Sequence, residues 1–90
     1  MIRSEAEIVN KLGLHARAAS KLVALAGRYN ARIGIGRPGQ KPADGKSIMA
    51  MLMLAANKGT RLAIECEGDD EQALHDAVLA LIANRFDEGE

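Results

Sequence analysis

Residues 60–82 read TRLAIECEGDDEQALHDAVLALI, a strand-like alternation followed directly by a helix-like repeat. Leu62, Ile64 and Cys66 alternate with outward positions, which predicts a strand over residues 60–67 with one apolar face. A helix is expected from Asp69, with Gln72 completing a pattern like a capping box and His75 on the solvent side. Its apolar stripe is Leu74, Ala77, Val78, Leu81 and Ile82. Each element therefore has one face to bury, and packing the helix on the strand would bury both.

The preceding residues continue this pattern. They predict strands over residues 4–9 and 31–36 and helices over residues 16–27 and 47–54. Residues 40–43 form a weak return strand at a sheet edge or count as loop, because Pro42 lacks a backbone donor. The helix over 16–27 has its buried stripe at Ala19, Leu22, Val23 and Ala26, with Lys21 facing water. We expect an α/β (α+β) fold, an open-faced β-sandwich in which three helices cover one face of a four-stranded antiparallel sheet. At this length, residues 1–90 form a single domain.

A histidine stands where a loop gives way to the first helix, in the stretch NKLGLHARAA of residues 10–19. Side chains of Ser, Thr, Asp or Asn usually cap such a position, so His15 breaks a local stability rule, and such breaks tend to mark function. A helix N-terminus attracts phosphate, and a neutral imidazole is a nucleophile at neutral pH. Arg17 can bind phosphate oxygens with its fork of donors. The stretch predicts a transient phosphohistidine at His15.

The charges are divided along the chain although 12 basic and 12 acidic residues cancel. Seven bases and no acid fall between Ile8 and Ala43, whereas nine acids and one base follow Leu62. If folding preserves this division, a basic field surrounds His15 and steers acidic or phosphorylated partners to it. Nucleic acid is not an expected partner, because Tyr29 and Phe86 are the only aromatic residues available for stacking on bases.

The short helix over residues 47–54 has too many apolar residues to bury. Ser47 is a favoured cap residue. Ile48, Leu52 and Ala55 are expected to face the core, whereas Met49 and Met53 lie round to the other side. The excess is either additional core or a docking patch of adaptable methionines.

Several classes of protein are not expected. A single cysteine excludes an internal disulfide, and Cys66 should be a buried core residue in a reducing compartment. The sequence has no signal peptide, spanning segment, nucleotide-binding loop or metal-ligand cluster. We therefore expect a cytoplasmic protein without metal or cofactor.

Two motifs at a fixed spacing carry a family resemblance. LGLHAR at residues 12–17 and GKSIM at residues 45–49 resemble the phosphocarrier HPr family of the bacterial phosphoenolpyruvate-dependent phosphotransferase system. The resemblance covers nearly the whole chain and implies that His15 accepts a phosphoryl group at Nδ1 from phosphorylated enzyme I and passes it to enzyme IIA domains. Arg17 would hold that group. Ser47 matches a regulatory serine modified by HPr kinase/phosphorylase. The implied docking residues are Lys21, Ile48, Met49 and Leu52.

One position departs from the family pattern, since Ala18 stands where proline is usual after the His-x-Arg triplet. Alanine has high helix propensity, so we expect the fold to survive. The opening NKLGLHAR also resembles the nitrogen-related branch, called NPr, so the branch stays open. Both branches imply a monomeric carrier rather than an enzyme. Two alternative functions come from other classes of protein. One is a regulatory binding protein that is switched at Ser47 and does not use His15. The other is an α/β-sandwich sensor that binds a small anion at the same helix end.

Overall fold

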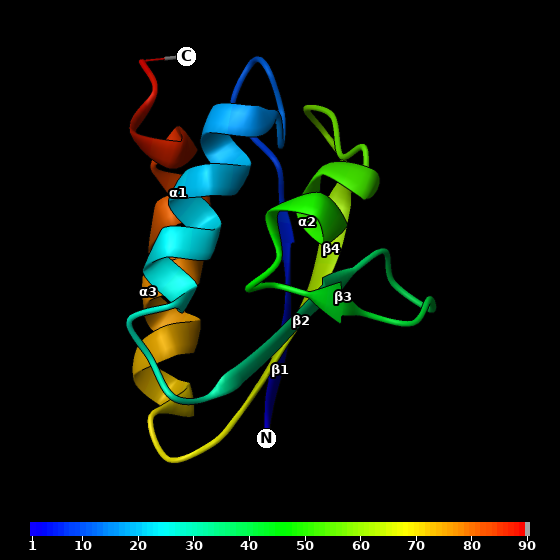
Figure 1. The fold of residues 1–90 in the computed structure, drawn as a ribbon. Helices are drawn as coiled ribbons and strands as arrows, with labels where there is room; N and C mark the ends of the chain where they lie inside the picture. Colours follow the sequence, from blue (N-terminus) through cyan, green and yellow to red (C-terminus); the bar gives the residue numbers. More distant parts are fainter. Residues whose placement is uncertain (90) are drawn as a thin grey trace.

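The computed structural model describes residues 1–89, so Glu90, one of the nine acids counted above, lies outside it. Eight elements follow one another along the chain (Figure 1). They are β1 (Ile2–Glu7), α1 (Ala16–Ala26), β2 (Arg32–Gly36), β3 (Ala43–Asp44), α2 (Ile48–Met53), β4 (Arg61–Glu67), α3 (Glu71–Ala83) and a 3-10 turn, η1 (Arg85–Asp87). The order matches the predicted one, with η1 as an addition.

The four strands form one antiparallel sheet in the order β1-β4-β2-β3. Ile64, in the middle of β4, pairs with Ser4 of β1 on one side and Ile35 of β2 on the other. All three helices lie on the same face of this sheet (Figure 1). The predicted open-faced sandwich is confirmed.

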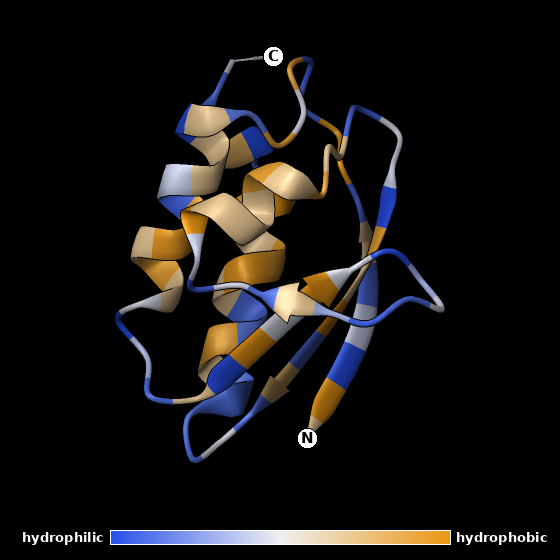
Figure 2. Ribbon diagram, turned by 45° about the vertical axis from the view of Figure 1, so that its right-hand side comes forward, coloured by the Kyte–Doolittle hydropathy of each residue, from blue (hydrophilic) through white to orange (hydrophobic). Residues whose placement is uncertain are grey.

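The strands bury one face and expose the other. Hydrophobic and hydrophilic residues alternate along them in Figure 2. Leu62, Ile64 and Cys66 are at most 1% exposed and join the apolar core beneath the helices. The outer face is lined with ion pairs between neighbouring strands, which leave it without a large apolar surface. These pairs are Arg3–Glu65 (3.3 Å), Arg61–Glu5 (3.2 Å) and Arg32–Glu67 (2.9 Å).

The weak strand lies later than its sequence pattern predicts. Residues 40–42 are loop, β3 contains only Ala43 and Asp44, and this short strand lies at the edge of the sheet, as expected for a segment that contains Pro42. Ala43 pairs with Ile35 and Asp44 with Gly34. Proline has no N–H to give to a ladder, so pairing begins only after Pro42.

The start of α3 also differs from the expected capping pattern. The helix begins at Glu71, and the Gly68 N–H donates to Glu71 Oε1 at 3.1 Å. Gln72 instead donates to Asp76 Oδ1 one turn later. Asp70 accepts hydrogen bonds from the Asn30 and Ala31 N–H groups at 2.8 and 2.7 Å. Its side chain therefore connects the start of α3 to the loop before β2 and does not cap its own helix.

The prediction that His75 faces solvent is wrong. It is 8% exposed, and its Nε2 lies 2.7 Å from Ser4 Oγ on β1. A hydroxyl on the inner face of the sheet satisfies a ring nitrogen that the apolar stripe could not. A polar residue beside an apolar stripe can therefore be buried when the opposing strand supplies a partner.

Candidate functional site

His15 caps α1 with its own ring. Its backbone is extended (φ −84°, ψ −176°), and the Arg17 N–H donates to its Nδ1 at 3.3 Å. The His15 carbonyl accepts the Ala19 N–H at 2.8 Å, which begins the helical ladder. The imidazole nitrogen thus occupies the place that a cap hydroxyl or carboxylate usually takes, at the positive end of the helix.

The loop before His15 is held by the segment that follows α2. Gly13 has φ +70°, and a Cβ there would lie 2.5 Å from the Ala56 carbonyl oxygen. The Leu14 N–H donates to that oxygen at 2.8 Å, and Leu14 is 4% exposed. A larger residue at Gly13 would clash with the backbone and displace the loop. The position of His15 is therefore determined by tertiary packing as well as by the helix.

A residue that the sequence did not indicate completes the site. Glu88 Oε2 lies 2.5 Å from His15 Nε2, and Glu88 Oε1 accepts from Asn10 Nδ2 at 3.0 Å. Desolvation, the largest single effect, raises the pKa of Glu88. Hydrogen bonds from Asn10 and His15 and the charges of His15 and Arg17 together lower it below the usual value. Glu88 is therefore a carboxylate at neutral pH, and as an acceptor it receives the Nε2–H of His15.

Glu88 also changes the expected electrostatics. The sequence placed basic residues around His15 and acidic residues elsewhere, but folding carries the acidic C-terminal segment to the start of α1 (Figure 1). The prediction of a purely basic field around His15 is therefore wrong at the ring itself, which the Glu88 carboxylate contacts. Arg17 remains exposed on the first turn of α1.

Lys21 does not lie free in water as its place on the helix suggested. It is half-buried, and its Nζ donates to the Phe86 carbonyl at 2.8 Å. It ties η1 to α1, one turn after the site.

Ser47 caps α2 as predicted. Its Oγ accepts the Ala50 N–H at 3.1 Å, and its side chain is half-buried. Lys46, the residue before it, donates from Nζ to the Tyr29 carbonyl at 2.7 Å. The two phosphorylation candidates thus occupy equivalent positions at two helix N-termini.

The apolar surface of α2 is larger than the sequence predicted. Ile48, Leu52 and Ala55 were expected to face the core, but all three are exposed. Met51, which is fully buried, supplies the core contact. A helix of six residues is too short for periodicity to fix which face is buried. The exposed large apolar side chains near the site, called here the α2 patch, are Ile48 (42% exposed), Met49 (70%), Leu52 (36%) and Met53 (80%).

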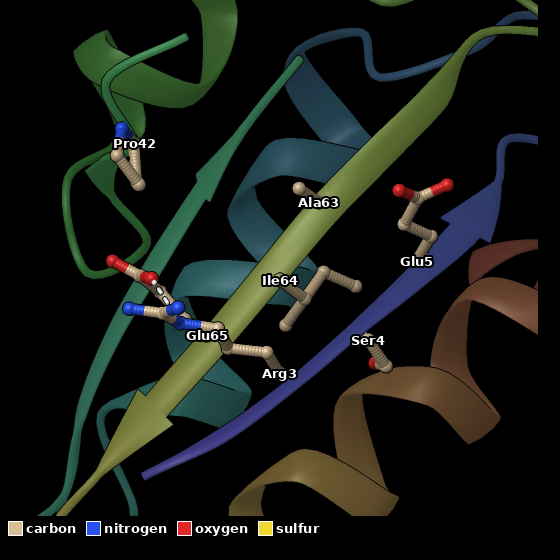
Figure 3. A pocket seen from close by; sticks show the side chains of 7 residues that line it. All are labelled: Arg3, Ser4, Glu5, Pro42, Ala63, Ile64 and Glu65. Atoms are coloured by element: carbon tan, nitrogen blue, oxygen red, sulfur yellow. Dashed lines mark ion pairs between the residues drawn. The ribbon is translucent and has the colours of Figure 1, made fainter. Parts of the chain in front are cut away.

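A hollow on the outer face of the sheet is shown in Figure 3. Its volume is about 340 Å³, and it lies over β1 and β4 with Pro42 at one side. The Arg3–Glu65 ion pair spans part of it. None of its lining residues is bonded to His15 or Ser47, so it is not part of the candidate site.

Neither a metal site nor a membrane span is found in the described chain. Among residues 1–89, no three His, Cys, Asp or Glu side chains are grouped so that they could hold a metal ion. No helix within that range has the length and apolar character needed to cross a membrane.

Comparisons with known proteins identify relatives of this chain and of its fold. A family model described as "PTS HPr component phosphorylation site" matches residues 2–84. The chain is 56% identical over 86 residues to a phosphocarrier protein HPr of Pseudomonas aeruginosa, covering 96% of each chain. It is 41% identical over 87 residues to a phosphocarrier protein NPr of Shewanella violacea, covering 97% of this chain and 94% of that one. A crystal structure of HPr-C-His from Thermoanaerobacter tengcongensis matches with a TM-score of 0.93 and 33% identity, and both chains are fully covered.

Proposed function

The chain belongs to the HPr family of phosphocarrier proteins of the phosphotransferase system, and we propose that His15 is the residue that carries the phosphoryl group. The observation that carries this proposal is the pair of contacts on its ring. Nδ1 faces the Arg17 N–H at the start of α1, while Nε2 faces the carboxylate of Glu88. These contacts support Nδ1 as the nucleophilic nitrogen, because a nitrogen that donates its hydrogen has no lone pair for attack.

The transfer step needs no cofactor. The Nδ1 lone pair attacks phosphorus, the bond between phosphorus and the donor breaks, and its electron pair stays with the donor. The phosphoryl oxygens then face the free N–H groups of the first turn of α1, which favour anions. Arg17 adds a full charge with two parallel donors. A single arginine with backbone donors binds the group loosely enough for onward transfer, which suits a carrier rather than an enzyme.

The family implies enzyme I as donor and enzyme IIA domains as acceptors. We place their docking on the α2 patch, chiefly Ile48, Met49 and Leu52, because exposed apolar side chains of this extent are typical of protein interaction sites. Lys21 belongs to this surface only through its exposed part, since its ammonium holds the Phe86 carbonyl. We further propose that residues 1–90 act as one monomeric domain in the cytoplasm.

We propose the sugar-transport branch, since the chain is 56% identical to the HPr of Pseudomonas aeruginosa. Identity alone does not separate the branches, because the 41% identity to the NPr of Shewanella violacea equals that to the HPr of Neisseria meningitidis. An NPr-type regulatory carrier is the alternative, and the identity of the enzyme IIA that accepts the phosphate distinguishes the two.

Ser47 supports a second, regulatory phosphorylation. Its hydroxyl lies at the N-terminus of α2, directly before Ile48 and Met49 of the α2 patch. A phosphate is tolerated at a helix N-terminus, but it places a double negative charge beside an apolar docking surface. Phosphorylation by HPr kinase/phosphorylase would then weaken docking without unfolding the chain.

The test is phosphorylation from phosphoenolpyruvate by enzyme I, followed by intact mass and phosphorus NMR. We expect one acid-labile phosphate on the wild type and none on His15→Ala. His75→Gln is the matched control, because His75 is the other histidine and is buried, and it should be phosphorylated like the wild type. If the wild type stays unmodified while enzyme I is shown to be charged, the carrier function is wrong and regulation centred on Ser47 takes its place.

A further inference from the structure

The C-terminal segment is built to hold Glu88 against the site. Phe86 is fully buried in the core, and its carbonyl accepts the Lys21 ammonium at 2.8 Å. The Glu88 N–H donates to the Arg85 carbonyl at 2.9 Å, which closes a turn just before the carboxylate. Anchoring by a buried aromatic side chain and a helix side chain fixes where Glu88 can lie.

The same segment adopts an uncommon backbone. Arg85, Phe86 and Asp87 all have φ between 54° and 63°, in the left-handed region that residues with a Cβ rarely adopt. Such a turn persists only where the surrounding contacts stabilise it. The contacts of Phe86 supply that stabilisation, and the geometric result is that a carboxylate meets the His15 ring.

Both oxygens of that carboxylate are engaged. Oε2 receives His15 Nε2–H, and Oε1 receives Asn10 Nδ2 from a side chain that is fully buried. The Glu88 side chain is 14% exposed and that of His15 is 28% exposed, so the contact is partly shielded from water. A partly shielded charge interaction is stronger than one on an open surface.

We infer that Glu88 is a positioning residue for phosphoryl transfer, which orients the His15 ring and balances the charge that the ring acquires. This inference rests on the function proposed for His15. A neutral ring that attacks phosphorus through Nδ1 keeps its hydrogen on Nε2 and becomes positively charged, because no proton leaves. The Glu88 carboxylate lies where that charge appears, and a prearranged opposite charge stabilises it as it forms.

The competing effect is repulsion between Glu88 and the incoming phosphoryl group, which is also negative. Arg17 reduces this repulsion, because its positive charge acts on the Glu88 carboxylate as well as on the phosphoryl group. The hydrogen bond to Nε2 is direct, at 2.5 Å, and the ring that donates it becomes charged, so we expect stabilisation to exceed repulsion.

The test compares Glu88→Gln with the wild type in phosphorylation by enzyme I. Glutamine keeps an acceptor oxygen for Nε2–H and similar volume but removes the charge. We expect kcat to fall about tenfold with little change in KM, as is typical for loss of one charge-assisted hydrogen bond. Asp87→Asn is the matched control, since Asp87 is an exposed acid in the same turn that bonds Asn84 rather than His15, and its rate should equal that of the wild type.

Nitrogen NMR of the unphosphorylated proteins measures the His15 Nε2–H signal directly. This signal would not change if Glu88 only supported the fold. We expect the Nε2–H signal of His15 to shift upfield in Glu88→Gln, while the core methyl signals stay in place. A wild type that accepts no phosphate would overturn the function of His15 itself. If the wild type is phosphorylated and Glu88→Gln matches or exceeds its rate, only the role of Glu88 is overturned.

Discussion

The starts of α1 and α2 are alike in position but differ in how the protein holds them. Each helix begins with a side chain that caps the first turn and can carry phosphate, His15 in one and Ser47 in the other. The cap of α1 is bonded from outside its helix by Glu88, and the helix buries Ala18, Ala19, Leu22 and Ala26. The Ser47 side chain bonds its own helix in the contacts described, while its backbone N–H donates to the Asp44 carbonyl of β3, and Met51 is the fully buried residue of α2. A fixed reactive group therefore lies beside a lightly anchored surface.

This difference suits two tasks. Phosphoryl transfer requires reacting atoms held in place, because small displacements of the nucleophile reduce the rate strongly. Docking to several partners benefits from exposed, flexible methionines that adapt to different surfaces. At its far end α2 is held by Arg37, whose Nη2 donates to the Leu54 and Ala55 carbonyls at 3.1 and 3.3 Å.

The anchoring of α2 can be broken by a single substitution. Met51→Ala removes the one fully buried side chain of the helix and leaves a cavity, so we expect the free energy of unfolding to fall by roughly 2–4 kcal/mol. Met49→Ala is the matched control and should change it by less than about 0.5 kcal/mol, since Met49 is 70% exposed. Urea denaturation measures both. Equal effects would show that α2 is not held through Met51.

The reactive end of α1 can be tested through Arg17. Arg17→Ala removes the charge that faces the phosphoryl oxygens, and we expect phosphorylation by enzyme I to slow by about a hundredfold. Arg28→Ala, a change just beyond the other end of the same helix, should leave the rate within about twofold because screening weakens distant exposed charges. A comparable loss in both variants would mean that general basic charge, not Arg17, drives the reaction.

Substitutions at Ser47 separate the effect of the helix cap on stability from the effect of negative charge on docking. Ser47→Asp keeps a cap but adds charge, so we expect unchanged stability and a KM for enzyme I raised about tenfold. Ser47→Ala removes the cap without charge, so it should lower stability by about 1 kcal/mol and leave KM nearly unchanged. Thermal unfolding and steady-state kinetics distinguish these outcomes. A raised KM in both variants would assign the effect to loss of the cap rather than to charge.

The smallest expected effect is at the start of α3. Hydrogen bonds from the Asn30 and Ala31 N–H groups lower the pKa of Asp70, with the Asn30 bond the largest cause. A lowered folded-state pKa stabilises the protein above the unfolded value, and this stability is lost as pH falls through the folded value. Asp70→Asn should therefore flatten the acid side of the stability curve slightly. An unchanged slope below pH ~4, the ordinary range of such a carboxyl, would contradict this.

Much of the fold followed from local pattern. The alternation of Leu62, Ile64 and Cys66 predicted β4 and its buried face, and the stripe of α1 was predicted at Ala19, Leu22 and Ala26. Val23 is only half-buried, and Ala18 takes its place in the core. Both caps, His15 and Ser47, were identified because capping depends on residues close in sequence.

The failures share a different cause. Glu88 meets His15 across 73 positions of sequence, and His75 meets Ser4 across 71, so no local pattern could indicate either contact. The buried face of α2 depends on packing against neighbouring elements rather than on its six residues. Asp70 resembled part of a capping pattern but found better donors on a loop 40 residues away. Tertiary contacts override local preference in each case.

The central claim is that Nδ1 of His15 carries the phosphoryl group while Glu88 holds the opposite nitrogen. Phosphorus and nitrogen NMR of the phosphorylated chain, with ¹⁵N in its two histidines, tests this most directly. The account predicts phosphorus bonded to Nδ1 of His15, with a hydrogen retained on Nε2. Phosphorus on Nε2, which would require Glu88 to leave the ring, or on any residue other than His15, would contradict it.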